Sequence, residues 1–514
     1  MADPFQQARE SISRIPLPHI NFTTAALTTL TAFLLWYTTT TIIQYRKLSH
    51  IPGPTLASLS LLWLLRTSSS TKAHLEFFDV TKKYGSIARI GPNVLLTDDP
   101  DLLRRMWAVR SDYKRSRWYK SLRLNPKRDS VVSTIDEELH NTLRAKLAAG
   151  YSGREVDGLE ARLDRNILDL VGLIETKYMT ANKPFDFGRK IQYLTLDILS
   201  DIGFSDRFGF LEADADLWEY LETLEKNFPT AMMLTVLPWV VELLGSPLLA
   251  SLMPSDKDPI GIGRMIGVTN EMVAKRYVVG DEKKVVKRDM LGSFVNHGLT
   301  RDEAESETVL QVVAGSDTTA GAIRHTMLYI LTNPRVMESM RREIDSHKLS
   351  WPVVTDAEAR DMPYLQAVIR EGLRMKPPIT GVMLKDSPEQ GDTWKGVYIP
   401  PGTKVGACVY GLLRREDIFG DDPEQFRPER WLEATPEKRL EMEGAVELIF
   451  SYGRFKCLGR NIAAIELNKT FVELIRRFDF AIVDPEKPWK SRNAGIFLIN
   501  DFWMRAYPRA VQTT

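Results

Sequence analysis

The sequence predicts a mainly α-helical fold with small β-sheets (the α+β class), preceded by one N-terminal transmembrane helix. Three observations agree with this class. An apolar stretch without charged residues covers positions 20–43, near the N-terminus. A long helical pattern covers positions 301–332. Two short strand patterns, at 87–90 and 94–97, are separated by the turn sequence Gly-Pro-Asn.

The uncharged stretch at 20–43 is long enough to cross a bilayer as a helix, although its many threonines lower the hydropathy. A cleaved signal peptide is the alternative, but the apolar core is long for one, and no convincing small-residue cleavage site follows. Basic residues lie on both sides of the stretch, so the charge bias that sets orientation is weak. We expect residues 1–19 to be a short N-terminal segment and residues 20–43 an uncleaved anchor.

A proline-rich break, Ile51-Pro52-Gly53-Pro54, follows the anchor and cannot be part of a helix. We expect residues 44–54 to form a linker and hinge, and residues 55–514 to form one catalytic domain. The formal net charge of +1 gives no argument for nucleic-acid binding. The two cysteines, Cys408 and Cys457, lie far apart, which argues against a disulfide framework and favours a reducing compartment. Cys408 falls in a run that is typical of a buried strand.

The apolar stretch at 228–252 contains three prolines, so it is a poor transmembrane helix. We expect these prolines, including Pro229, to break it into short helices that line an apolar pocket and contact the membrane surface. Glycines at 261, 263 and 267 are faintly similar to a dinucleotide-binding loop. Their spacing is wrong by one residue and no strand precedes them, so we reject a nicotinamide site. Any electrons must then come from another protein.

The sequence F-S-Y-G-R-F-K-C-L-G at 450–459 contains the candidate metal ligand, Cys457. This cysteine follows a glycine turn and precedes a helical pattern, where the helix dipole favours a thiolate. Arg454 and Lys456 add positive charge nearby. These features suit a single thiolate ligand to a large planar metal cofactor, whereas zinc needs three or four ligands at short spacings. An ordinary buried cysteine is the alternative.

The run A-G-S-D-T-T at 314–319 lies inside the long helical pattern, where glycine and threonine are unfavourable. Such exceptions to helix propensity are expected at functional sites. Gly315 would open the helix so that a ligand can approach its backbone. Asp317 and Thr318 offer an acid and a hydroxyl for proton delivery. A packing kink is the alternative.

Two further pairs of residues lie at helical spacing. His140 and Arg144 share one face of a helix predicted over 138–152, where a guanidinium fork and a histidine N–H can bind a carboxylate. A solvated surface pair is the alternative. Glu371 and Arg374 place a carboxylate and a guanidinium on one face, and the run F-R-P-E-R-W follows at 426–431.

The stretch around Cys457 resembles the heme-binding loop of the cytochrome P450 family, F-x-x-G-x-R-x-C-x-G. Phe450, Gly453, Cys457 and Gly459 match, but Phe455 stands where the family has an arginine. Other runs resemble the family's A-G-x-D-T, E-x-x-R, P-E-R-F and W-x-x-x-R motifs, the last with histidine in place of tryptophan. The resemblance extends from about residue 51 to the C-terminus and is greatest to filamentous-fungal members of specialised metabolism.

This resemblance implies a mainly helical fold with small sheets and a heme b (iron protoporphyrin IX) bound by the Cys457 thiolate. Asp317 and Thr318 would be the acid and the alcohol of proton delivery. Glu371, Arg374 and Arg430 would form a structural ion triad. The expected heme contacts are His140, Arg144, Lys385, Phe450, Gly453, Arg454, Cys457 and Gly459.

The implied reaction inserts one oxygen atom from O₂ into a lipophilic small molecule, a fungal secondary-metabolite intermediate. Electrons would come from NADPH through a separate NADPH–cytochrome P450 reductase, with cytochrome b5 as a further candidate donor. Two alternatives are a reductase-independent heme-thiolate isomerase or dehydratase and a non-enzymatic heme-binding membrane protein. The Asp317–Thr318 pair argues against both.

The expected location is the endoplasmic reticulum membrane, with a single span and a cytosolic catalytic domain. Two glycosylation sequons bear on this topology. We expect no glycan on Asn468, which we place in the cytosol. Asn21 lies on the lumenal side but adjoins the membrane.

Overall fold

The computed structural model describes residues 22–125, 128–277 and 287–509, and helices dominate this part of the chain. The helices of seven or more residues are α2 (Phe22–Lys47), α4 (Leu62–Ser69), α5 (Ala73–Tyr84), α6 (Pro100–Trp107), α7 (Glu137–Tyr151), α8 (Leu159–Leu173), α9 (Phe187–Phe204), α11 (Tyr220–Leu234), α12 (Pro238–Leu244), α13 (Gly261–Ala274), α14 (Met290–Asn296), α15 (Arg301–Thr332), α16 (Pro334–Ser346), α18 (Pro363–Met375), α22 (Pro436–Val446) and α23 (Arg460–Arg477). Shorter helices are α3 (Thr55–Leu59), α10 (Phe210–Ala213), α17 (Asp356–Arg360), α19 (Val409–Leu412), α20 (Glu416–Phe419) and α21 (Glu429–Glu433).

The strands are short and form small sheets. They are β1 (Ile87–Gly91), β2 (Val94–Thr97), β3 (Lys114–Arg115), β4 (Phe185–Asp186), β5 (Lys385–Asp386), β6 (Asp392–Trp394), β7 (Val397–Ile399), β8 (Lys404–Ala407), β9 (Phe478–Ile482), β10 (Lys490–Asn493), β11 (Phe497–Asn500) and β12 (Trp503–Pro508). The largest sheet has the order β1-β2-β8-β5-β3, and the others are β4-β12-β9, β10-β11 and β6-β7. This architecture confirms the predicted class, and β1 and β2 confirm the two strand patterns.

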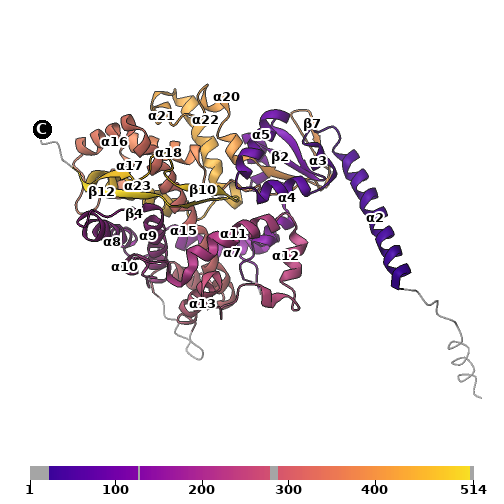
Figure 1. Cartoon of the computed structure of the whole chain (residues 1–514), viewed down its shortest axis with the longest axis horizontal. Coiled ribbons are helices and arrows are strands. Elements are labelled where there is room, and N and C mark those ends of the chain that lie inside the picture. Colours follow the sequence, from indigo (N-terminus) through magenta and orange to yellow (C-terminus); the bar gives the residue numbers. More distant parts are fainter. Residues whose placement is uncertain (1–21, 126–127, 278–286, 510–514) are drawn as a thin grey trace, which may run out of the picture.

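Helix α15 runs through the centre of the body and packs against α9, α13, α18 and α23 (Figure 1). A capping box starts it, because Thr300 and Glu303 each accept the backbone N–H of the other. The helix is continuous through Gly315, so the predicted opening is absent. A Cβ atom at this position would lie 2.2 Å from Cδ1 of Leu199 on α9. The glycine therefore allows α9 and α15 to pack closely.

Two local predictions were wrong. Pro229 lies inside α11 instead of ending it, and only the segment after that helix is broken into α12 and a 3-10 turn at Ala250–Leu252. Cys408 does not belong to a strand, because β8 ends at Ala407 and Cys408 is the residue that precedes α19. Cys408 is nevertheless buried, as expected.

Helix α2 is the one helix of the described ranges that is long and apolar enough to cross a membrane. It projects away from the body (Figure 1) and ends at Lys47, beyond the end of the anchor expected at residues 20–43. Residues 1–21, which include the expected N-terminal segment and the Asn21 sequon, lie outside the described residues.

Arg89 of β1 fixes the end of α2 to the body. Its guanidinium is 1% exposed and donates to the carbonyl oxygens of Gln44 (3.0 Å) and Tyr45 (3.3 Å), in the last turn of α2. It also donates to the carbonyls of Ser58 (3.2 Å) and Pro92 (2.7 Å). The last carbonyls of a helix have no partner within the helix, so this guanidinium satisfies groups that would otherwise be unpaired.

Replacing Arg89 by methionine is expected to destabilise the connection between α2 and the body. The buried carbonyls would lose their donor, which costs about 2–3 kcal/mol. Thermal unfolding of the full chain in detergent should show a lower Tm, and limited proteolysis should cut faster between residues 44 and 58. Arg46→Met, at an exposed position of the same helix, is the matched control. Equal cleavage rates in the two variants would contradict this role of Arg89.

Candidate active site

The cysteine loop is closed by a backbone hydrogen bond from the N–H of Cys457 to the carbonyl oxygen of Phe450 (2.8 Å). Gly453 has φ +59°, and a Cβ atom there would lie 2.4 Å from the carbonyl oxygen of Trp107, at the end of α6. The turn therefore requires glycine, both for its conformation and for its close approach to α6. Phe450, Gly453, Cys457 and Gly459 all lie in this one loop, as predicted.

The Cys457 side chain is solvent-accessible, yet the surrounding protein raises the pKa of its thiol. Partial burial of the sulfur raises this pKa. The thiolate is favoured by the backbone N–H groups of Gly459 and Arg460 and by the guanidinium of Arg144, but their effect is smaller than that of burial. The expected ease of ionisation is therefore wrong for the protein alone, because burial outweighs the effect of the backbone N–H groups at the start of α23. A coordinating metal cation deprotonates a thiol outright, so the raised pKa is compatible with a ligand role.

A solvent-accessible space adjoins α15 near its middle. Ala314 is exposed, although α9, α13, α18 and α23 pack around this helix and most of its residues are buried. Cys457 is exposed just before α23, which packs against α15. Ala314 and Cys457 can be exposed inside the body only if there is space beside them. A large planar cofactor would occupy such a space.

Asp317 and Thr318 follow Ala314 on α15. An oxygen of Asp317 accepts a hydrogen bond from Nε2 of Gln192 on α9. Burial raises the pKa of Asp317 to about 6, against the opposing effects of Gln192 and Arg324. The Thr318 hydroxyl donates to the carbonyl oxygen of Ala314 (2.9 Å) and stays partly accessible. No sequence motif points to Gln192, which lies 125 residues away from Asp317.

Phe455, in the cysteine loop, is surrounded by basic side chains. The imidazole of His140 lies 4.9 Å from its ring, between centroids, and burial lowers the pKa of His140 to about 4. Nζ of Lys385 lies 3.4 Å from the ring centroid, and burial lowers the pKa of Lys385 to about 6. The guanidinium of Arg115 lies 4.6 Å from the same centroid. The sequence analysis missed Arg115, because it lies in an irregular basic stretch without a motif.

The two remaining predicted heme contacts differ in their partners. Arg144 is half-buried, makes no hydrogen bond with any other residue of the described part, and lies close enough to Cys457 to favour its thiolate. Arg454 is already paired. It forms an ion pair with Glu137 (3.0 Å) and donates to the carbonyl oxygen of Val109.

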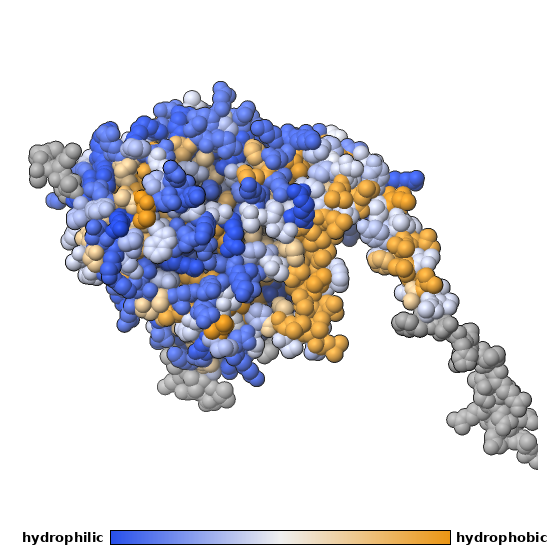
Figure 2. All heavy atoms as spheres, viewed as in Figure 1, coloured by the Kyte–Doolittle hydropathy of each residue, from blue (hydrophilic) through white to orange (hydrophobic). Residues whose placement is uncertain are grey.

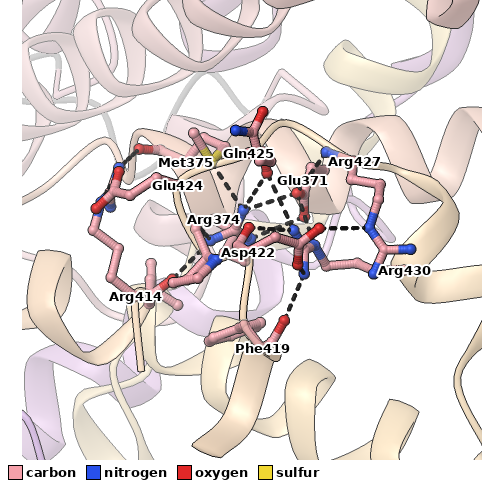
Figure 3. A network of polar contacts seen from close by, with 12 residues as sticks. Glu371, Arg374, Met375, Arg414, Phe419, Asp422, Glu424, Gln425, Arg427 and Arg430 are labelled. Carbon is pink, nitrogen blue, oxygen red and sulfur yellow. Dashed lines mark hydrogen bonds and ion pairs between the residues drawn. The ribbon is translucent and has the colours of Figure 1, made fainter. Parts of the chain in front are cut away.

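Glu371 is the centre of a buried polar network (Figure 3). Its carboxylate accepts from Nη2 (2.8 Å) and Nε (2.9 Å) of Arg374, and from Nε of Arg430 (3.0 Å). It also accepts from the backbone N–H of Arg427 (2.9 Å) and from Nε1 of Trp431 (3.0 Å). The predicted ion triad is therefore present. Trp431 is an unforeseen member, in the place of the phenylalanine of P-E-R-F.

The same network holds the chain that leads toward the cysteine loop. Arg374 donates to the carbonyl oxygens of Leu413 (2.9 Å) and Pro423 (2.6 Å). Arg430 donates to the carbonyl oxygen of Phe419 (2.5 Å). Backbone carbonyls of an irregular segment need such donors when they are buried. The network has a role in the fold, and none of these side chains is free for chemistry.

An apolar cavity of about 310 Å³ lies between the body's N-terminal part and α11 and α12, and its lining includes Trp118, Met232, Val236 and Trp239. This confirms an apolar pocket lined by part of the 228–252 stretch. No residue that lines this cavity comes from α15 or the cysteine loop, so it is separate from Cys457. Trp118 Nε1 donates to Thr235 Oγ1 (3.0 Å) beside it.

Exposed apolar side chains gather near this cavity, on the side of the body from which α2 projects (Figure 2). Four of them belong to α12 and the following turns. They are Trp239, Leu243, Leu248 and Leu252, which are 51–89% exposed. Exposed patches of this kind mark contact with a membrane or another apolar partner.

Comparison with known proteins agrees with this site. The family model "Cytochrome P450" matches residues 51–501. Cytochrome P450 monooxygenase ABA1 of Pyricularia oryzae (strain 70-15) is 39% identical over 492 residues, which cover 93% of this chain and 96% of that protein. Cytochrome P450 monooxygenase aba1 of Botryotinia fuckeliana (strain B05.10) is 38% identical over 88% of this chain and 90% of its own length. Cytochrome P450 monooxygenase pkfB of Emericella nidulans is 32% identical over 89% of this chain and 90% of its own length.

Among solved structures, the crystal structure of the cytochrome P450DA heme domain matches with a TM-score of 0.71 and 19% identity, over 90% of this chain and 98% of that one. This likeness shows the fold. Together with the sequence relatives, it identifies a monooxygenase of the type found in fungal secondary metabolism, an oxidoreductase whose cofactor is heme b. The chain belongs to the cytochrome P450 family.

Proposed function

We propose that this monooxygenase inserts one oxygen atom from O₂ into a lipophilic intermediate of fungal secondary metabolism, with electrons from NADPH through a separate NADPH–cytochrome P450 reductase. The observation that carries the proposal is the placement of Cys457 just before α23 and of the Asp317–Thr318 pair on α15, since these two helices pack together. The exposed apolar patch on α12 and the following turns supports a lipophilic substrate. Cytochrome b5 is a further candidate electron donor.

Cys457 is the proposed axial ligand, and heme with a thiolate ligand supplies the cleavage of the O–O bond. Phe450, Gly453 and Gly459 shape the loop that presents the sulfur. His140, Arg144 and Lys385 are proposed to bind the heme carboxylates, because guanidinium and ammonium groups form charge-assisted hydrogen bonds with carboxylates. Arg454 is proposed to stabilise the loop through its ion pair with Glu137 on α7.

Asp317 is proposed to deliver protons, with Thr318 as the hydroxyl at the reaction side. A pKa of about 6 suits this task, since a general acid works best when its pKa lies near the working pH. Gln192 holds the carboxyl in place through its amide N–H. Below about pH 6 the carboxyl keeps its proton, and above it the protonated fraction falls. Proton delivery by Asp317 is therefore expected to slow as the pH rises.

Replacing Asp317 by asparagine is expected to lower the rate of product formation about 100-fold, because general acid–base groups contribute factors of this size. NADPH consumption should continue, so the yield of product per NADPH should fall. The decline in rate above about pH 6 should also disappear. Asp302→Asn, an exposed position on the same helix, is the control. An unchanged product yield in Asp317→Asn would contradict the assigned role.

The proposed location is the endoplasmic reticulum membrane, with α2 as a single span and the catalytic domain, residues 55–514, in the cytosol. Arg46 and Lys47 lie in the last turn of α2, within the proposed linker of residues 44–54 that joins the span to the catalytic domain. The prediction that Asn468 carries no glycan has structural support. Its side chain is 2% exposed and donates to Oδ1 of Asp356 (2.8 Å), which leaves no room for a sugar.

The substrate can be found by deleting the gene in the producing organism and identifying the metabolite that accumulates. That metabolite is then incubated with the purified protein, reductase, NADPH and isotopically labelled O₂. The proposal expects a product that has gained one labelled oxygen atom, and only when both NADPH and reductase are present. Conversion without reductase would instead identify an isomerase or dehydratase, and a heme-loaded protein without any conversion would favour a non-enzymatic role.

A further inference from the structure

Glu307 is a buried acid of α15 that has no role in the mechanism proposed above. It is 3% exposed, and its Oε1 accepts a hydrogen bond from the backbone N–H of Val131 (2.6 Å). Within the described ranges, no basic side chain forms an ion pair with it. Burial raises the pKa of Glu307 to about 8, with the Val131 N–H opposing this effect and Glu303 adding to it. The carboxyl is therefore mostly protonated at neutral pH and acts as an uncharged hydrogen-bond acceptor.

This hydrogen bond is one of several that hold an irregular segment, residues 128–134, in place. Nη1 of Arg115 on β3 donates to the carbonyl oxygens of Val131 (2.8 Å) and Thr134 (2.9 Å). Val131 thus has its N–H bound by α15 and its carbonyl oxygen bound by β3. Buried backbone polar groups outside regular secondary structure need such partners. Loss of the Glu307 acceptor would release Val131 from α15, while Arg115 would still bind it from β3.

Two observations place the 128–134 segment beside the space that adjoins Ala314. Glu307 precedes Ala314 by seven residues, which is two helical turns, so both lie on one face of α15, about 10 Å apart along its axis. Arg115, which binds the carbonyl side of the segment, also contacts the ring of Phe455 in the cysteine loop, at 4.6 Å from its centroid. The segment is thus held between the helix face that contains Ala314 and a side chain that contacts the cysteine loop. Its position is that of a wall of the space in which the heme site is proposed.

We propose that Glu307 is a positioning residue of this monooxygenase: its carboxyl fixes the 128–134 segment as one wall of the space beside Ala314, and that wall determines how a ligand lies at the heme iron. The inference rests on the proposed heme site at Cys457 and extends it to the choice of the carbon that is oxidised. A wall that is ordered before binding favours one ligand orientation, because binding then needs no further ordering of the protein. An uncharged acceptor suits this position, since an unpaired buried charge would be unfavourable. A role in the fold alone would instead affect all ligands equally.

The test uses two ligands of heme iron, imidazole and 4-phenylimidazole, whose Kd values are measured from the absorption spectrum of the heme-loaded full chain in detergent. Imidazole reports on the iron alone, whereas the phenyl group must also fit against the walls of the space. Glu307→Met removes the acceptor, so it should raise the Kd of 4-phenylimidazole about fivefold and that of imidazole less than about twofold. Glu307→Gln keeps an uncharged acceptor and should retain both parent values. Glu305→Met is the matched control, because Glu305 lies on the same helix and pairs with the exposed Arg301 (2.9 Å).

A second variant, Val131→Pro, removes the same hydrogen bond from the donor side. Val131 begins a turn that is closed by a hydrogen bond from the Thr134 N–H to the carbonyl oxygen of Ser130 (3.0 Å), and proline is favoured at such a position. This variant should raise the Kd of 4-phenylimidazole as Glu307→Met does. Amide hydrogen exchange across residues 128–134 should be faster in both variants than in the parent, because the segment is less firmly held.

The products formed from the substrate that gene deletion identifies give a third readout. Glu307→Met should oxidise additional positions of that molecule, whereas Glu307→Gln should give the product pattern of the parent. An unchanged ratio of the two Kd values in both Glu307→Met and Val131→Pro, or an equal loss in Glu307→Gln, would overturn this inference alone. An unchanged product pattern in Glu307→Met would do the same. A parent protein without the thiolate-type spectrum would overturn the proposed function instead.

Discussion

Replacing Glu371 by glutamine is expected to lower the free energy of unfolding by about 3–5 kcal/mol, because it breaks a buried ion network by removing one partner. The Glu371 carboxylate accepts hydrogen bonds from both Arg374 and Arg430, and all three side chains are buried. A neutral amide would leave the buried Arg374 guanidinium without its counter-charge, and Arg430 would keep only its ion pair with Asp422 (2.9 Å). The loss is comparable with the whole stability of many domains, which is about 5–15 kcal/mol.

The measurement is thermal unfolding of the heme-loaded protein, followed by circular dichroism and by heme absorbance. The Glu371→Gln variant should unfold at a lower temperature and release heme earlier. Glu441→Gln on α22 is the matched control, since Glu441 is half exposed and, among the described residues, forms an ion pair only with Lys438. If both variants unfold at the same temperature, the network around Glu371 does not support the fold as described.

Replacing Cys457 by serine is expected to abolish the monooxygenase activity while leaving the fold intact. Cys457 is the one cysteine of the loop, and a serine oxygen cannot donate electron density to iron as a thiolate does. The Cys457 side chain is exposed, so the substitution should change the stability of the heme-free protein by less than about 0.5 kcal/mol.

Product formation with reductase, NADPH and the identified substrate measures this effect, and circular dichroism checks the fold. Cys408→Ala is the control. Cys408 is buried and lies outside the loop, so its loss should affect stability and leave activity in place. Substantial activity in Cys457→Ser would contradict the assigned axial ligand.

The sequence predicted those features that depend on neighbouring residues. The helix expected at residues 301–332 has the bounds of α15, because its helical pattern is long. Strands β1 and β2 were found because a Gly-Pro-Asn turn separates them. Cys457, Asp317 and Glu371 were found because each lies in a short motif whose spacing carries chemical meaning.

The partners of these residues could not be predicted, because tertiary packing brings them from distant segments. Gln192 reaches Asp317 from α9, and Arg115 reaches Phe455 from β3. Neither residue lies in a motif. Pro229 was expected to end a helix, because proline has no backbone N–H to donate, but α11 continues through it. The raised pKa of Cys457 likewise depends on burial, which the helix-dipole argument did not include.

The central claim is that the Cys457 sulfur is the axial ligand of a heme iron. The most direct measurement is the absorption spectrum of the dithionite-reduced, carbon monoxide-saturated protein, recorded for the parent and for Cys457→Ser. The parent should show the strongly red-shifted Soret band of a thiolate-ligated heme, and the variant should lack it. A band that is absent from the parent, or that persists in the variant, would contradict the claim.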